Sequence, residues 1–314
     1  MVSSDVTVPV SLLGRLTIGA FRIIGILPFS ARSKLGFALG YLFGLLPTRD
    51  RLITKKQLQL FLPGKNAASL TPRVFGNAAR ATLESFNLRA ICARPEEYVT
   101  CSNWITIQTW LEEDRPLVVL TAHTGNWDLL AAYGIARGAK ITTIGREARV
   151  LAVHEALKWM REQYGVETIW RSDRAGLKRL LSCFRERRVI AALIDQDTKV
   201  ESVFVPFFGK PTRTPSSMIE LGKKFNSRFV YAFIVRTSTG KFDLRVGEID
   251  NTLETDGILS VYSSQLQAII ESHPEQWVWF HKRWRSDPTG TTLGSRQYLA
   301  WLTEETQRSV KTHI

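Results

Sequence analysis

From about residue 115 onward, short apolar runs rich in β-branched residues alternate with longer segments of helical periodicity. The apolar runs predict strands at residues 116–122, 140–145, 166–170, 189–195, 202–209, 229–236 and 241–249. The segments between and after them predict helices at 126–137, 151–164, 175–187, 215–224 and 257–274. Strands that alternate with crossover helices are typical of a three-layer α/β domain with a mostly parallel sheet.

The first 95 residues have a different pattern, with helical periodicity interrupted at four proline positions. We therefore predict an N-terminal helical, membrane-associating region at 1–95 and an α/β domain at 96–290. A polar and partly ordered C-terminal tail is predicted at 291–314. The sequence shows no internal repeat and no low-complexity linker.

The segment 10–29 is strongly apolar but contains Arg15 and Arg22, and the next apolar block, 35–47, has 13 residues. A membrane-spanning helix needs about 20 apolar residues, so neither block is typical of one. The two arginines would share one helical face and aliphatic residues another, a pattern that favours a helix lying in the membrane interface. A core helix of a soluble cap and a tilted span with snorkelling arginines are the alternatives.

The chain of 314 residues has a formal net charge of +13 and a pI of about 9.9. Such an excess favours binding to polyanions, such as an anionic membrane surface, an acidic protein or nucleic acid. No helix-turn-helix, RNA-recognition or zinc pattern accompanies the charge, which argues against nucleic acid. The three cysteines, Cys92, Cys101 and Cys183, show no paired spacing, so we expect neither a disulfide framework nor a zinc site.

Candidate chemistry lies where the strand predicted at 116–122 ends, in the stretch HTGNWD from His123 to Asp128. Gly125 permits a sharp turn, and Asn126 is a favourable helix N-cap. Asp128 in the first helical turn would be close enough to orient the His123 ring and strengthen it as a base. The alternative is a loop histidine followed by an aspartate that complements the helix dipole.

His-x4-Asp after a buried strand resembles the signature of glycerolipid-type acyltransferases. Four further stretches agree in order: TKKQLQLFLPG at 54–64, LIDQD at 193–197, VPFFGKPTRTP at 205–215 and HPEQWVWFHKRW at 273–284. With them, residues from about 12 to 285 resemble the lysophospholipid and lipid A biosynthesis acyltransferase family. This resemblance implies transfer of a fatty acyl chain from a thioester, on acyl carrier protein or coenzyme A, to a hydroxyl of a membrane glycolipid.

The resemblance also implies a location and an acceptor. It places the protein at the cytoplasmic face of a cell inner membrane, peripheral or anchored by its N-terminus, with no cofactor and no metal. A lipid A precursor is the first expectation for the acceptor. Phosphatidylinositol mannoside or another glycolipid stays open, because the motif ends in Asp128 where many lipid A enzymes have Glu. A catalytically inactive protein that binds anionic lipid at the membrane surface is a further alternative.

Within the resemblance, His123 is the expected general base and Asp128 its orienting partner. Arg146 matches an arginine that binds acceptor phosphate or sugar, although its surroundings, IGREARV, depart from the family pattern; a solvated arginine is the alternative. Asn126 is included among the residues expected to bind substrate.

A second group of expected substrate ligands lies ahead of the helix predicted at 215. Flexible backbone, cations and a hydroxyl near a helix N-terminus favour phosphate, and an exposed basic turn is the alternative. The group consists of Gly209, Lys210, Arg213 and Thr214. Near the C-terminus, Trp277, Trp279 and Trp284 alternate with cations, which suits a lipid headgroup boundary.

Overall fold

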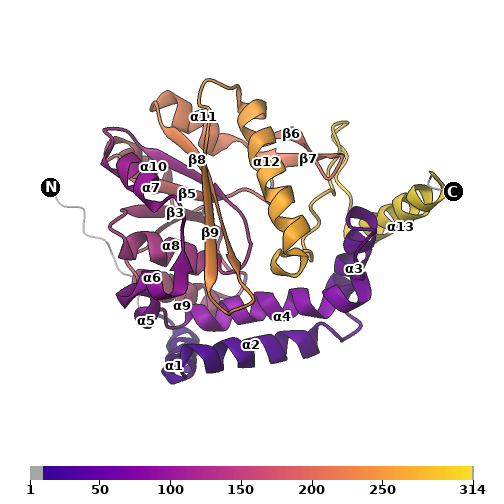
Figure 1. The fold of residues 1–314 in the computed structure, drawn as a ribbon, viewed down its shortest axis with the longest axis horizontal. Helices are drawn as coiled ribbons and strands as arrows, with labels where there is room; N and C mark the ends of the chain where they lie inside the picture. The colour runs from indigo at the N-terminus through magenta and orange to yellow at the C-terminus, as the bar shows by residue number, and fades with distance from the viewer. Residues whose placement is uncertain (1–9, 313–314) are drawn as a thin grey trace.

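A computed structural model describes residues 10–312. Its centre is a seven-stranded sheet with the strand order β1-β9-β8-β2-β5-β3-β4 (Figure 1). All neighbouring strands run parallel except β8 and β9, which form an antiparallel pair. The strands are β1 (Val99–Thr100), β2 (Leu117–Thr121), β3 (Ile141–Gly145), β4 (Glu167–Trp170), β5 (Val189–Leu193), β8 (Arg228–Arg236) and β9 (Phe242–Ile249). The expected α/β fold with a mostly parallel sheet is confirmed.

Helices cover both faces of the sheet because its central strands are apolar on both sides. Leu117 on β2 packs with α7 (Trp104–Glu112), and Ala232 on β8 packs with α8 (Trp127–Ala136). Val118 and Leu120, which point the other way, join the core formed with the helices of the opposite face. Those helices are α10 (Gly176–Arg185), α11 (Ser217–Lys224) and α12 (Thr255–Ser272). Of two further helices, α9 (Leu151–Glu162) connects β3 to the edge strand β4, and the short α6 (Pro95–Tyr98) leads into β1 at the opposite edge.

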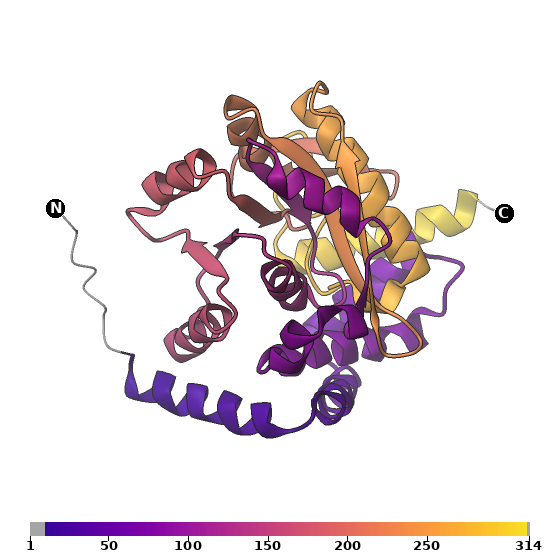
Figure 2. The ribbon, with the colours of Figure 1, turned by 60° about the vertical axis from the view of Figure 1, so that its left-hand side comes forward.

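The N-terminal region consists of helices, as expected, and α1 and α2 meet at a bend of 118° (Figure 2). No single helix in the described part of the chain is both long and apolar enough to cross a membrane, although this bent pair passes that test together. The helices of this region are α1 (Leu12–Ile26), α2 (Phe29–Phe43), α3 (Arg49–Phe61), α4 (Ala67–Ser85) and α5 (Arg89–Ala93).

Glycines four residues apart bring α2 unusually close to α4. Gly36, Gly40 and Gly44 lie along one face of the helix, and a Cβ at any of them would collide with the backbone of α4. The outward faces of α1 and α2 carry many exposed apolar side chains together with the exposed cations Arg15, Arg22 and Lys34. Large aliphatic side chains exposed on these two helices include Leu12, Leu13, Leu16, Ile23, Ile26, Leu35, Leu39 and Leu42.

Two segments differ from the sequence-based expectation. The strand predicted at 202–209 is present as β6 (Ser202–Phe207), but the residues after it, for which no strand was predicted, form β7 (Lys210–Pro215) and complete an antiparallel hairpin. The C-terminal stretch, expected as a polar tail, contains α13 (Ser295–Thr312). Tyr298 and Leu302 are fully buried there. Because they are four residues apart, they share one face of this mainly polar helix, and that face packs against α3.

Candidate active site

His123 lies two residues beyond the end of β2, at the carboxyl edge of the sheet. Gly125 has a φ of +51°, and a Cβ there would collide with the carbonyl oxygen of Ile234 on β8. The turn therefore requires glycine at this position. Asn126 caps α8 by accepting a hydrogen bond from the backbone N–H of Leu129 at 2.9 Å, which confirms the predicted N-cap.

Asp195 is the carboxylate that contacts His123. Thr121 on β2 and Leu193 on β5 are register partners, and His123 and Asp195 each follow their partner by two residues. Parallel strands bring such positions together at one edge. Asp195 Oδ1 lies 2.8 Å from His123 Nδ1, and Asp195 Oδ2 accepts the His123 backbone N–H at 3.0 Å.

The environment of Asp195 keeps it ionised. Its side chain is fully buried, and burial alone would raise its pKa. The charge of His123, its two hydrogen bonds and a third from the indole N–H of Trp277 at 2.9 Å outweigh burial and hold the pKa of Asp195 well below its usual value. With a carboxylate on Nδ1, the His123 tautomer carries its proton there and leaves Nε2 as the basic nitrogen.

A second histidine lies beside the first. Nε2 of Gln196 is 3.3 Å from Nε2 of His123 and 2.9 Å from Nε2 of His281. Burial, followed by the charge of His123, lowers the pKa of His281 to about 4, so this ring is neutral at physiological pH and can accept the amide hydrogen of Gln196. His123 remains reachable, with 22% of its side chain exposed.

Asp128 does not contact His123 in this structure, contrary to the sequence-based prediction. Its Oδ1 accepts a hydrogen bond from Nε of Arg161 at 2.9 Å, and this ion pair joins α8 to α9. The first turn of α8 directs Asp128 toward the neighbouring helix, while the strand register brings Asp195 to the ring. The place predicted for Asp128 is therefore taken by Asp195.

Arg146 lines a basic cavity of about 540 Å³ that includes His281 and Gln196. Asp197 also lines it, but this carboxylate is buried and paired with Arg285 at 3.6 Å. The cations of this cavity come from loops after β3, β4 and β5 and from the segment after His281. They are Arg146, Arg149, Arg171, Lys199, Lys282 and Arg285.

The other expected substrate ligands are not brought to this cavity. Lys210 on β7 forms an ion pair with Glu305 of α13, and the Thr214 hydroxyl accepts a hydrogen bond from Arg283 at 2.6 Å. Arg213 donates to the carbonyl of Val200 at 2.9 Å. Gly209, with a φ of +71°, forms the hairpin turn, and Asn126 is 1% exposed. In this conformation these five residues have structural contacts in place of a substrate.

The tryptophans near the C-terminus are core residues, so the interpretation as a headgroup boundary is wrong for their side chains. Trp277, Trp279 and Trp284 are at most 4% exposed. Trp284 stacks on Phe61 with ring centroids 3.7 Å apart, and Trp277 supports Asp195. The interleaved cations do not share one environment either, because Arg283 is buried while Lys282 and Arg285 line the basic cavity.

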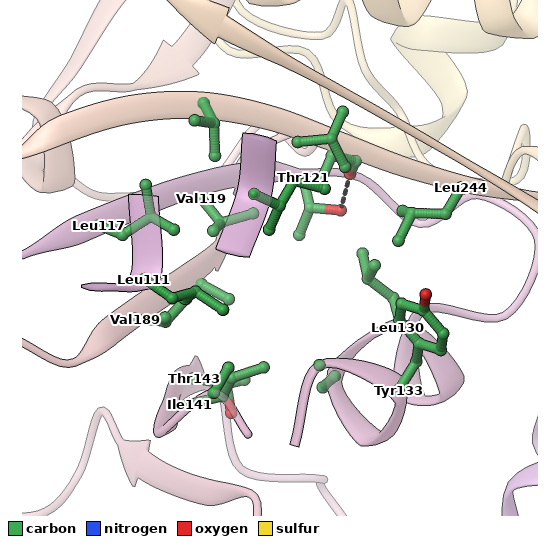
Figure 3. A pocket seen from close by; sticks show the side chains of 18 of the residues that line it. Leu111, Leu117, Val119, Thr121, Leu130, Tyr133, Ile141, Thr143, Val189 and Leu244 are labelled. Atoms are coloured by element: carbon green, nitrogen blue, oxygen red, sulfur yellow. Dashed lines mark hydrogen bonds between the residues drawn. The ribbon is translucent and has the colours of Figure 1, made fainter. Parts of the chain in front are cut away.

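An apolar cavity lies between the sheet and the helices α7 and α8 (Figure 3). Its floor follows the strand register, from Leu117 and Val189, through Val119 and Ala191, to Thr121 at the carboxyl edge. Trp127, which lines this cavity, packs edge-on against the ring of His123 with centroids 5.0 Å apart. Trp104 and Trp110 of α7 contribute to its walls.

Sequence reasoning missed the pairing of Asp195 with His123, although one signal was present. Both residues follow apolar strands by the same short interval, and carboxyl ends of neighbouring parallel strands meet. The order of the strands in the sheet, which makes β2 and β5 neighbours, is not encoded locally. The contributions of Gln196, Arg149 and Arg171 had no comparable signal.

Comparisons with known proteins find one matching family model and several curated relatives. A family model described as "Bacterial lipid A biosynthesis acyltransferase" matches residues 2–286. A phosphatidylinositol mannoside acyltransferase of Mycobacterium tuberculosis (strain ATCC 25618 / H37Rv) is 23% identical over 173 residues, covering 54% of this chain and 55% of the relative. One of Mycolicibacterium smegmatis (strain ATCC 700084 / mc(2)155) is 22% identical over 181 residues, covering 56% of this chain and 59% of the relative. The chain thus spans somewhat over half the length of these curated relatives.

Proposed function

The chain belongs to the bacterial lipid A biosynthesis acyltransferase family and is an acyltransferase; from this premise we propose that it acylates a membrane glycolipid. The acyl chain comes from a thioester, on acyl carrier protein or coenzyme A, and the acceptor is a glycolipid hydroxyl. One observation carries the proposal: His123, bound to Asp195, lies between Trp127 of the apolar cavity and Gln196 of the basic cavity.

The apolar cavity is the proposed site of the fatty acyl chain. It follows one face of the sheet over the whole of β2, from the carboxyl edge to Leu117. The lining residues from Leu117 to Thr121 span four residues of strand rise, roughly 13 Å, along which we place an extended aliphatic chain. A chain inserted to this depth would leave its thioester at the carboxyl edge, beside Trp127 and His123.

The chemistry then follows from the geometry of His123. Its Nε2 takes the proton of the acceptor hydroxyl as the oxygen attacks the thioester carbonyl carbon. The new C–O bond forms, the C–S bond breaks, and the thiolate leaves with the proton returned by the imidazolium. Asp195 holds the ring in its tautomer and stabilises its charged state, as the aspartate of a serine-hydrolase triad does. No acyl-enzyme is required, because the acceptor hydroxyl stands in the place of serine.

The basic cavity is the proposed site of anionic groups of the substrates. Six cations face one partnered carboxylate, an excess that favours phosphate or pyrophosphate. Phosphates occur both in coenzyme A and in phosphorylated glycolipids, so charge alone does not distinguish donor from acceptor. Arg146, expected from the sequence, is one of these cations.

We further propose that the protein is peripheral on the cytoplasmic face of the inner membrane. The exposed aliphatic side chains of α1 and α2 support this location, since soluble proteins rarely expose so many contiguous apolar residues. Of the two arginines predicted to share a face of this helix, Arg22 contacts the protein itself, over the ring of Trp159 on α9 and 5.1 Å from its centroid.

Two acceptors have specific support. The family description names lipid A biosynthesis, and we propose a lipid A precursor first. The mycobacterial relatives are phosphatidylinositol mannoside acyltransferases, and the motif, which ends in Asp128, keeps that second choice open. Lipid mass spectrometry of a strain that lacks the protein tests both, because the missing acyl chain identifies donor and acceptor together.

The transfer reaction is tested with purified protein, labelled acyl-coenzyme A or acyl carrier protein, and a lipid extract. We expect label in a glycolipid band with wild-type protein and none above background with His123→Ala. A matched thermal unfolding curve controls for folding. If the protein is inactive and only binds anionic lipid, neither the wild type nor the His123→Ala variant would produce labelled glycolipid. Turnover of the His123→Ala variant at the wild-type rate would exclude His123 as the base.

A further inference from the structure

A third cavity, of about 830 Å³, lies between α2, α4 and the turn that joins β8 to β9. The active site uses neither its cations nor its aromatic wall. Phe37 and Tyr41 of α2 form one wall, and Asn77 of α4 and Ser238 of the turn contribute polar groups. Four arginines from three elements line it: Arg73, Arg80, Arg236 and Arg245.

The four arginines of the cavity outnumber the two carboxylates of its lining, Asp243 and Glu275. Arg236 is bound to Glu84, and Arg245 lies 3.0 Å from Asp243. Within residues 10–312, neither Arg73 nor Arg80 forms an ion pair. These two cations are therefore available to an anion.

Arg80 is held ready for such a ligand. Its guanidinium lies over the ring of Phe37, 4.4 Å from the centroid, which fixes the plane of the group. Its Nε is buried and has no hydrogen-bond partner in the described structure. Buried N–H groups without a partner are rare in native proteins, and a planar guanidinium matches the oxygens of a phosphate.

The same helix that forms the aromatic wall also carries an exposed apolar face. Phe37 and Tyr41 are four residues apart and share one side of α2, while the exposed Leu35, Leu39 and Leu42 lie on another side. We propose that this cavity binds the phosphate of an anionic membrane phospholipid, whose acyl chains lie along the leucine face of α2. The inference rests on the proposed membrane association but not on the transfer reaction.

The test compares vesicles of phosphatidylcholine with vesicles that also contain phosphatidylglycerol, using sedimentation of the full chain. The variant Arg73→Gln/Arg80→Gln removes two charges from the cavity. Its control, Lys178→Gln/Arg185→Gln, removes two exposed charges from α10, which Figure 1 places far from α2. We expect the cavity variant to lose about tenfold or more of the preference for phosphatidylglycerol and the control to keep it. Equal loss in both variants, or none in the first, would overturn the site.

A second variant guards against misfolding. Ser238 is exposed in the turn, so Ser238→Glu adds a negative charge to the cavity without removing any packing. We expect it to lower the phosphatidylglycerol preference while the thermal unfolding curve stays unchanged; unchanged preference contradicts the inference. Displacement of the protein from vesicles by millimolar inorganic phosphate would identify a site for free phosphate and overturn a lipid site. The lipid site would also be overturned if these variants lost binding to acyl carrier protein but kept wild-type binding to vesicles.

Transfer activity separates this inference from the proposed function. With donor and acceptor dispersed in detergent, we expect the cavity variants to transfer acyl chains at the wild-type rate. If the protein prefers phosphatidylglycerol vesicles but transfers no acyl group, the proposed lipid site is supported and the proposed transfer function is contradicted. A loss of detergent-phase transfer in the Ser238→Glu variant would instead place this cavity within the reaction and overturn a separate lipid site.

Discussion

The two cavities whose linings include neighbours of His123 are built in different ways. The apolar cavity is formed by alternate side chains of neighbouring strands under α7 and α8, so its floor repeats the register of the sheet. The basic cavity is formed by cations in loops after several strands, with no regular spacing between them. Side chains on strands and helices give the apolar cavity a fixed shape. The basic cavity is defined mainly by the positive charges of its loops. We therefore expect the first to select substrates by size and the second to select them by phosphate.

The largest effect is expected at His123, for which two candidate carboxylate partners can be compared. Asp195→Asn removes the charge that steers His123, and we expect transfer to fall by about 10² to 10⁴-fold, with the unfolding temperature measured alongside. Asp128→Asn breaks the ion pair between Asp128 of α8 and Arg161 of α9, whose side chains are each 18% exposed. We expect this variant to lower the transfer rate by less than about tenfold. Initial rates with labelled donor measure both. The reverse order of effects would return Asp128 to the role that the sequence suggested.

This pair of carboxylates shows how far sequence reasoning reaches. The strand at 116–122 and the helix start at Asn126 follow from local patterns, and both are confirmed. Asp195 is 72 positions from His123, and only the order of strands in the sheet brings the two residues together. Local patterns predict where a strand ends, but a contact at the sheet edge depends on which strand lies next to it.

The same distinction applies to the C-terminal region. The alternation of tryptophans and cations at 277–285 suggested a lipid boundary, but Trp277 and Trp284 are buried in the core. Burial depends on what the chain packs against, and here the partner of Trp284 is Phe61 of the N-terminal region. The glycine stripe of α2 was a readable signal of close helix packing, because three glycines at four-residue spacing remove the side chains from one face.

The basic cavity gives the second prediction. Arg146→Gln removes a charge-assisted contact to substrate phosphate, worth about 1.5–3 kcal/mol, so we expect the KM for the phosphorylated substrate to rise about tenfold or more. The kcat is expected to change less, because Arg146 is not placed at the reacting atoms. Arg185→Gln on α10 is the charge-matched control and should leave both constants unchanged. A fall in kcat alone would mean that Arg146 acts on the reaction centre.

The apolar cavity gives the third prediction, which concerns chain length more than rate. Ala191→Leu adds volume in the middle row of the cavity floor, and we expect the preferred acyl chain to become shorter by a few carbons. Trp110→Ala removes a large side chain from the wall near the amino ends of the strands, and we expect longer chains to be accepted. Competition among saturated acyl donors of different length measures the preference. If both variants keep the wild-type profile, the chain does not lie along this sheet face.

The smallest effect concerns His281, which faces the basic cavity but is kept neutral. Its pKa is lowered to about 4 in the folded protein, whereas an unfolded chain has the ordinary value of about 6.5. Between these two values the unfolded chain binds more protons, so stability must fall as the pH falls from about 6.5 toward 4. At pH 5 the loss from this group is about 2 kcal/mol.

The measurement is the free energy of unfolding by urea at pH 7.5 and at pH 5, for wild type and for His281→Gln. We expect the variant to lose less stability between the two pH values, even if it is less stable overall. The groups that surround His281 are His123, Asp195, Gln196, Asp50, Asp197 and the cations of the cavity. Asp195 stays ionised throughout this range because its pKa is held low. An equal pH dependence in both proteins would show that His281 carries a proton in the folded state. In that case the Gln196 amide could not donate to it, and the basic cavity would hold one more positive charge than the cations of its loops.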